Sequence, residues 1–169
     1  MPARPNRSQL LAEVIAEAPR QAGAIVRLNI AIGHQLGMAL ADLQCMRLLS
    51  DKPSTPSQLA AQLGLTTGAM TKVLDRLQNA GFITRSADPS DRRRIIIAAD
   101  PAGLAELAGH FGPMGDQMSA YLSRCTRDEL ETILEFMRAG REAADEQITR
   151  IRRGGIRHAT RRPRGAATR

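Results

Sequence analysis

The sequence predicts a mainly α-helical fold with one small β-hairpin. Aromatic residues make up only 2% of the 169 residues, so the core has to be built from Leu, Ile, Met and Ala, as in helical bundles. Apolar residues recur at spacings of three and four along most of the chain. Only two neighbouring short runs, 82–86 and 94–98, favour strands. The length suits one domain, or one domain with an arm.

The first third of the chain predicts an arm and three helices. Residues 10–18 carry a short amphipathic pattern that Pro19 is expected to end or kink, which gives an N-terminal arm and short helix over 1–19. A second helix is predicted over about 20–36. Its apolar residues cover more of the helix circumference than one small core can bury, so a further packing partner is expected. A third helix follows over about 40–50.

Two short helices joined by a tight turn are predicted next. Thr55 is suited to cap the first helix, Pro56 to occupy its first position and Gly64 to stop it. Thr66 is suited to cap the second helix, whose apolar residues fall at i, i+3, i+4 and i+7 and face the core: Met70, Val73, Leu74 and Leu77. Two helices of this size and spacing are the layout of a helix-turn-helix.

The opposite face of the second helix carries small, hydroxyl and basic side chains, which is the chemistry expected of a DNA-reading helix. Small residues near its start let the backbone approach the floor of the major groove, and the positive end of the helix dipole favours phosphates. The candidate DNA-binding residues are Thr67, Ala69 and Thr71 for base edges, Lys72 and Arg76 for phosphates, and Thr66 and Gly68 beside them.

The two β-rich runs predict a hairpin whose connection over 87–93 is rich in turn-forming residues. The hairpin tip presents three successive arginines, and Asp91 is near enough to pair with one guanidinium and fix its direction. Arginine suits a narrow minor groove because its flat cation is cheaply dehydrated. The hairpin is therefore predicted to be a wing with the candidate DNA-binding residues Asp91, Arg92, Arg93 and Arg94.

The sequence resembles the multiple antibiotic resistance regulator (MarR) family of winged-helix transcription factors over roughly residues 20–150. The resemblance rests on residues 36–49, on the helix-turn-helix and above all on Asp91-Arg92-Arg93, which is similar to the family's Asp-x-Arg wing signature. It implies that Arg93 enters the minor groove and that Asp91 orients it. Ala39 departs from the family, whose members usually carry a Ser or Thr helix cap at that position.

Two long helices are predicted after the hairpin. Asp100-Pro101 is suited to begin the first, and Gly112-Pro113 is expected to kink it. Residues 126–129 form a capping box for the second helix, whose apolar stripe continues to Ile151.

The predicted winged lobe, about 39–99, is flanked by helices over about 20–36 and 101–151, all within a MarR-like domain over 20–151. The apolar surface of these helices is larger than a lobe of this size can bury. We therefore predict that the N-terminal and C-terminal helices together form the interface of a two-fold homodimer. An intramolecular three-helix bundle is the alternative.

Residues 152–169 lack apolar periodicity and acidic residues, so we expect a disordered basic tail. Seven of the 24 Lys and Arg residues lie there, and the remaining 17 balance the 17 Asp and Glu, so the net charge of +7 belongs to this tail. Its arginines are suited to phosphate contact regardless of sequence. A solubilising tail without a partner is the alternative.

Cysteine and histidine spacing predicts neither a metal site nor a disulfide framework, and no cofactor is expected. Cys45 is expected to be buried and inert. Cys125, beside two arginines, is expected to be a plain surface thiol, with a lowered pKa as the alternative. No nucleophile–base pair, phosphate-binding Gly loop or paired carboxylates indicate an enzyme. No signal peptide or membrane span is recognised, so a cytoplasmic location is expected.

These features predict a sequence-specific transcriptional regulator, a repressor, that binds a pseudo-palindromic operator in double-stranded DNA as a homodimer. The family resemblance implies release by a small, often aromatic effector between the DNA-reading lobe and the dimer helices, and it identifies no effector-binding residues. The alternative is an architectural protein that coats DNA with little sequence preference. The ratio of specific to non-specific affinity separates the two functions.

Overall fold

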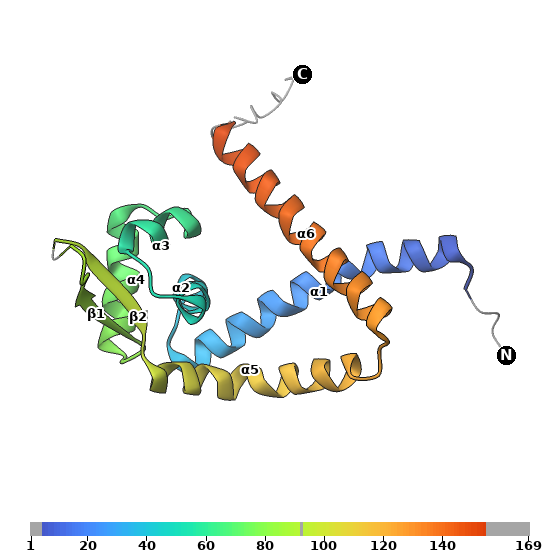
Figure 1. The fold of residues 1–169 in the computed structure, drawn as a ribbon, viewed down its shortest axis with the longest axis horizontal. Helices are drawn as coiled ribbons and strands as arrows, with labels where there is room; N and C mark the ends of the chain where they lie inside the picture. The colour runs from blue at the N-terminus through green and yellow to red at the C-terminus, as the bar shows by residue number, and fades with distance from the viewer. Residues whose placement is uncertain (1–4, 92, 155–169) are drawn as a thin grey trace, which may run out of the picture. The chain divides into compact units, whose positions relative to one another are not determined.

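The computed structural model describes residues 5–91 and 93–154, which form six helices and one two-stranded sheet (Figure 1). The chain divides into two compact units, Met1–Pro113 and Met114–Arg169. The predicted mainly α fold with a single small hairpin is confirmed.

α1 (Arg7–Leu36) is a single helix of 30 residues, capped at its start by reciprocal hydrogen bonds between Asn6 and Gln9. The predicted end of a short helix near residue 19 is wrong, because Pro19 lies inside α1. A proline within a helix removes one backbone hydrogen bond, and the helical residues on both sides supply the others. α1 ends at Gly37, whose φ of 66° lies in the left-handed region that suits glycine.

The winged lobe lies in the first unit, and its elements follow one another in the predicted order (Figure 1). They are α2 (Leu40–Asp51), α3 (Pro56–Leu63), α4 (Thr67–Asn79), β1 (Ile83–Ala87) and β2 (Ile95–Ala99). Thr55 and Thr66 cap α3 and α4 as predicted, and Gly64 ends α3 with a φ of 68°. The helix-turn-helix is therefore built from the capping residues that the sequence indicated.

Each strand lies one residue later than predicted. The reason at the start of the hairpin is that Phe82 makes its backbone hydrogen bonds with residues outside the sheet. Its N–H donates to the Leu77 carbonyl oxygen at 2.9 Å, and its carbonyl oxygen accepts from the Asp100 N–H at 2.9 Å. The antiparallel register then runs from Ile83 opposite Ala99 to Ala87 opposite Ile95. Phe82 thus closes the end of α4 and joins the two ends of the hairpin.

One apolar core unites the helices of the lobe with the hairpin. Six of its side chains are at most 1% exposed: Cys45, Met46, Leu59, Met70, Leu77 and Ile97. A third backbone segment also pairs with the hairpin, since Ser54 and Ile97 exchange hydrogen bonds of 3.0 and 2.9 Å. The recognition unit and the wing are therefore held to each other by side chains and by backbone.

α5 (Pro101–Leu122) begins directly after the hairpin, and its first turn packs against Phe82. A Cβ added at Gly103 would lie 2.8 Å from the Cα of Phe82, so only glycine fits at this position. Pro113 lies inside α5, which continues to Leu122.

α6 (Arg127–Arg153) starts with the predicted capping box, in which Thr126 and Glu129 exchange hydrogen bonds. The helix extends two residues past the predicted boundary at Ile151, because residues up to Arg153 continue its hydrogen bonding. The remainder of the predicted basic tail, 155–169, lies outside the described residues. No residue of α6 is buried, and its apolar side chains Leu130, Leu134, Met137, Ile148 and Ile151 are 38–64% exposed.

Candidate nucleic-acid interface

The first turn of α4 combines hydroxyl groups with an uncovered stretch of backbone. Thr66 Oγ1 accepts from the Ala69 N–H at 3.2 Å, and Thr71 Oγ1 donates to the Thr67 carbonyl oxygen at 3.0 Å. Thr67 and Gly68 are exposed, whereas Ala69 is half-buried. A Cβ added at Gly68 would meet nothing within 4 Å, so the backbone here is open to an approaching groove.

The two cations of α4 have different surroundings. Lys72 is exposed, and no hydrogen bond or ion pair of its side chain occurs among residues 5–91 and 93–154. Arg76 donates from Nε and Nη2 to the two carboxylate oxygens of Asp42, at 3.2 and 2.7 Å. This hydrogen bonding raises the pKa of Arg76 above its ordinary value, so the side chain stays charged. Lys72 is therefore the freer of the two predicted phosphate-binding residues.

A second ion pair joins α4 to the wing. Arg85 of β1 donates from Nη2 to Asp75 Oδ1 at 2.6 Å. The pair bridges the exposed side of α4 and the first strand, so the hairpin and the recognition helix are linked at their surface as well as in the core.

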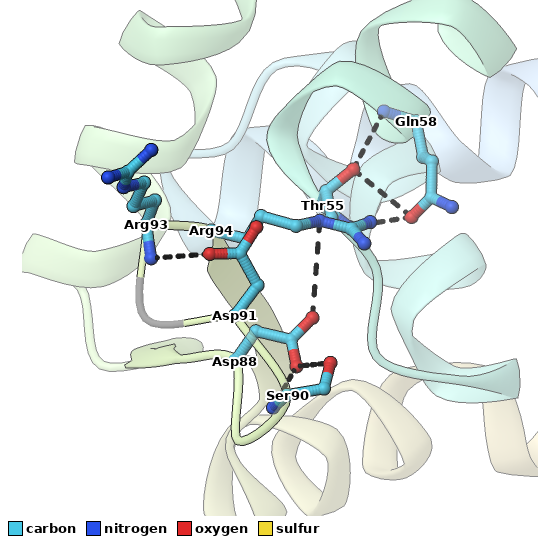
Figure 2. A network of polar contacts seen from close by, with 7 residues as sticks. All are labelled: Thr55, Gln58, Asp88, Ser90, Asp91, Arg93 and Arg94. Carbon is cyan, nitrogen blue, oxygen red and sulfur yellow. Dashed lines mark hydrogen bonds and ion pairs between the residues drawn. The ribbon is translucent and has the colours of Figure 1, made fainter.

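The tip of the wing is ordered by the side chains of Asp91 and Asp88 (Figure 2). Asp91 Oδ1 accepts from the backbone N–H of Arg93 at 3.0 Å, while the Arg93 guanidinium extends away from that carboxylate. Asp91 therefore orients Arg93 through its backbone, whereas the sequence suggested pairing with a guanidinium. Arg93 is exposed, and within the described part of the chain its guanidinium has no hydrogen-bond or ion-pair partner.

Asp88 pairs with a different arginine of the tip. Asp88 Oδ2 lies 4.0 Å from Arg94 Nε, and Oδ1 accepts from the hydroxyl and the backbone N–H of Ser90 at 2.6 and 2.8 Å (Figure 2). The hydrogen bonds from Ser90, with a smaller contribution from Arg94, lower the pKa of Asp88. Of the three predicted wing arginines, Arg94 is thus held by Asp88, Arg93 extends freely, and Arg92 lies outside the described residues.

An open groove of about 340 Å³ lies between α4 and the hairpin. Its walls are mainly apolar, with the guanidinium-bearing Arg85 and the hydroxyl of Thr71 among them; the lining residues are Pro56, Thr71, Leu74, Arg85, Ser86, Ala87, Ile95 and Ile97. The groove therefore adjoins two of the elements that carry the candidate DNA-binding residues.

Comparison with known proteins agrees with this geometry. The MarR family model matches residues 39–95, which span the helix-turn-helix and most of the wing. The transcriptional regulator HosA of Escherichia coli O111:H- is 30% identical over 95 residues, which are 55% of this chain and 70% of HosA. The chain belongs to the MarR family. Its members are DNA-binding transcriptional regulators, and the resemblance seen in the wing signature is confirmed.

Similarity to known proteins extends beyond the residues that the family model matches. The uncharacterized HTH-type transcriptional regulator YcgE of Bacillus subtilis (strain 168) is 29% identical over 153 residues, which are 90% of this chain and 99% of YcgE. The crystal structure of RV1404 from Mycobacterium tuberculosis superposes with a TM-score of 0.60 at 20% identity, covering 83% of this chain and 96% of that one. The similarity to RV1404 concerns the fold alone.

Two residues that organise this MarR-family lobe were not identified from the sequence. Asp42 is 1% exposed and pairs with Arg76, although 34 positions separate them. Asp42 also accepts from the Ala39 N–H at 2.8 Å, which supplies half of a capping box where Ala39 offers no side-chain acceptor. The acidic residue three positions after the missing cap was the signal that could have found it. Ser54, the other residue, showed no comparable signal.

In the described part of the chain, neither cysteine is among the candidate DNA-binding residues. The predicted burial of Cys45 is confirmed. Burial, with a smaller effect of Asp42, raises the pKa of its thiol to about 12, which favours the expected lack of reactivity. Cys125 is half-buried in the turn between α5 and α6. Among the described residues, no group of three His, Cys, Asp or Glu could hold a metal ion.

No described helix is by itself long and apolar enough to cross a membrane. α1 and α2 meet that criterion only when taken together, across a bend of 99°.

Proposed function

We propose that this MarR-family regulator binds a pseudo-palindromic operator as a homodimer, with α4 in the major groove and the wing in the minor groove of each half-site. The observation that carries the proposal is the state of Arg93. Its backbone is fixed by Asp91 and its guanidinium is exposed and unpaired within the described residues, so the cation is presented to a partner without first breaking an ion pair. A narrow minor groove is the DNA feature that attracts such an arginine.

Dimerisation is supported by the apolar faces that the single chain leaves exposed. On α1, Leu11, Val14 and Ile15 are 50–64% exposed. On α6, Leu134, Met137 and Ile151 are 46–64% exposed. Contiguous apolar faces on long helices are typical of surfaces that a second copy covers. A two-fold dimer would present two winged lobes to successive half-sites about 10 base pairs apart.

In this proposal the protein represses transcription by occupying the operator. A dimer bound across two half-sites covers at least two turns of DNA, which excludes RNA polymerase where the operator overlaps a promoter. Mapping of bound sites across the genome should yield an inverted repeat, and placing that repeat over a reporter promoter should lower reporter expression. Scattered binding without a shared motif would instead favour the architectural alternative.

A small aromatic effector forms part of the proposal. The groove beside α4 has apolar walls from Leu74, Ile95 and Ile97. Arg85, which donates from Nη2 to Asp75, has further N–H donors for an acidic substituent of a ligand. This groove lies between the recognition helix and the wing, whereas the family resemblance implies a site beside the dimer helices. A ligand in the groove would compete with the joint approach of the recognition helix and the wing to DNA. Titration of aromatic carboxylic acids against the protein–operator complex tests this part, and release that persists in Arg85→Gln would place the effector elsewhere.

Separate substitutions of two neighbouring residues of α4 test how the helix is oriented in the major groove of DNA. Lys72→Ala should weaken binding to all DNA sequences alike and reduce the slope of log affinity against log salt by about 0.9, because one phosphate contact is lost. Thr71→Ala should instead alter which operator bases matter, since this residue is assigned to base edges. Fluorescence anisotropy with the operator and its single-base variants provides both readouts. The reverse pattern would mean that α4 is rotated relative to this assignment.

A further inference from the structure

The carboxylate of Asp42 joins the start of α2 to the last turns of α4. Its Oδ2 accepts from the Ala39 N–H at 2.8 Å and from Arg76 Nε at 3.2 Å, while Oδ1 accepts from Arg76 Nη2 at 2.7 Å. Two parallel hydrogen bonds between a guanidinium and a carboxylate constrain angle as well as distance. Because Asp42 is 1% exposed and set in the core, this constraint fixes how α4 is placed against α2.

The same carboxylate is connected to the end of α1. Ala39 directly follows Met38, whose N–H donates to the Gly33 carbonyl oxygen at 2.8 Å. The two backbones are in direct contact, since a Cβ added at Gly33 would lie 2.5 Å from the Met38 carbonyl oxygen. Asp42 therefore ties the recognition helix to the junction between α1 and α2.

Arg76 has two conceivable roles in DNA binding, and they differ in what Asp42 does. Gly68, Lys72 and Arg76 are spaced four residues apart and so share one face of α4. On this face a free guanidinium would reach phosphates, and Asp42 would then be a competitor that weakens DNA binding. In the structure, Asp42 instead takes two of the guanidinium's donors, with half of the Arg76 side chain exposed.

We propose that Asp42 is a positioning residue for operator recognition, which holds α4 in its reading orientation by engaging Arg76. The inference rests on the proposed reading of DNA by α4. It assigns Arg76 to placing the helix, and it leaves Lys72 as the phosphate-binding cation of α4. The two roles of Arg76 predict opposite changes in operator affinity when the charge of Asp42 is removed.

The decisive variant is Asp42→Asn, which keeps the size of the side chain and an acceptor for the Ala39 N–H but removes the charge. Anisotropy is measured with the operator duplex and with a scrambled duplex of equal length, at one salt concentration. If Asp42 positions α4, operator affinity falls by about tenfold, the order expected for coupling within one hydrogen-bond network, while affinity for scrambled DNA stays unchanged or rises. If Arg76 is a phosphate contact, freeing it raises affinity for both duplexes, which overturns the proposal.

Asp51→Asn is the matched control, because it removes the same charge from the same helix. Asp51 is exposed and pairs only within α2, with Arg47 at 3.0 Å, among the described residues. Any general effect of a more positive protein on DNA binding appears in both variants. A specific loss confined to Asp42→Asn supports positioning, and equal behaviour of the two variants contradicts it.

Stability is separated from positioning by two further measurements. Thermal melting and stoichiometric titration with excess operator give the folded and active fractions of each variant. If the active Asp42→Asn protein keeps the wild-type dissociation constant, Asp42 is only structural and the proposal fails. If wild-type protein itself shows no preference for the operator, the proposed function fails first, and the two failures are thus distinguishable.

Arg76→Lys keeps the inference testable should Asp42→Asn fold poorly. Lysine retains the charge but lacks the planar fork, so it can replace a phosphate contact but not a two-point constraint. Positioning predicts that Arg76→Lys loses about as much operator affinity as Asp42→Asn, and that the double variant is no weaker than either single one. Wild-type operator affinity in Arg76→Lys would contradict the proposal.

Discussion

Replacing Leu134 with glutamate should convert the protein to a monomer and abolish tight operator binding. Leu134 is 46% exposed in the single chain and lies on the apolar stripe of α6. In a dimer seam the new carboxylate would be desolvated without a partner, which costs far more than it does on a free surface. Because two linked lobes bind a two-part site by factors of roughly 10² to 10⁴ better than one lobe, loss of the dimer should lower operator affinity by a factor of that order.

Light scattering and anisotropy on the same samples measure both effects of Leu134→Glu. The matched control is Gln147→Glu, which places an equal charge at an exposed, polar position of the same helix. The control should remain a dimer of twice the chain mass and keep its affinity. A dimeric Leu134→Glu protein with wild-type affinity would show that the seam does not include this stripe and would favour a three-helix arrangement within one chain.

Replacing Arg93 with alanine should weaken operator binding by about 1–3 kcal/mol, as expected for a lost charged contact to DNA. The melting temperature should not change, since the Arg93 guanidinium makes no contact that stabilises the described residues. Asp91→Ala should cost less, because it removes only the acceptor that fixes the Arg93 backbone at 3.0 Å. Anisotropy with the operator, together with thermal melting, measures these differences.

Arg47→Ala is a suitable control for Arg93→Ala. Arg47 is an exposed cation whose guanidinium contacts lie within α2, to Ser50 and Asp51. Its removal lowers the net charge equally but takes no proposed contact away. If both variants lose the same small amount of affinity, the wing acts only through general charge, and the assignment of Arg93 to the minor groove is incorrect.

Local signals allowed much of the fold to be predicted. The capping residues Thr55, Thr66 and Thr126, and the terminator Gly64, act within one helical turn, so the ends of α3, α4 and α6 can be inferred from neighbouring residues. The buried face of α4 follows from its spacing for the same reason. The predicted helix end at Pro19 was wrong because a proline destabilises only the adjacent turn, whereas the continuity of α1 depends on the whole helix.

The candidate site was only partly predictable because its decisive contacts are long-range. The chemistry of Arg93 and Lys72 could be anticipated from their types and positions, as could their exposure. The pairing of Arg76 with Asp42 could not, because nothing near Arg76 in the chain distinguishes a residue bound by a buried carboxylate from a free cation. The link between Arg85 and Asp75 likewise depends on how the hairpin packs against α4.

The ratio of operator affinity to non-specific affinity, measured on the full chain in one buffer, tests most directly whether the winged lobe reads sequence. Anisotropy with the mapped operator and with a scrambled duplex of equal length and composition provides both constants. Reading by α4 and the wing predicts a ratio of about 10³ or more at physiological salt, as for other specific regulators. A ratio near one would contradict sequence-specific regulation and identify the protein as an architectural DNA binder.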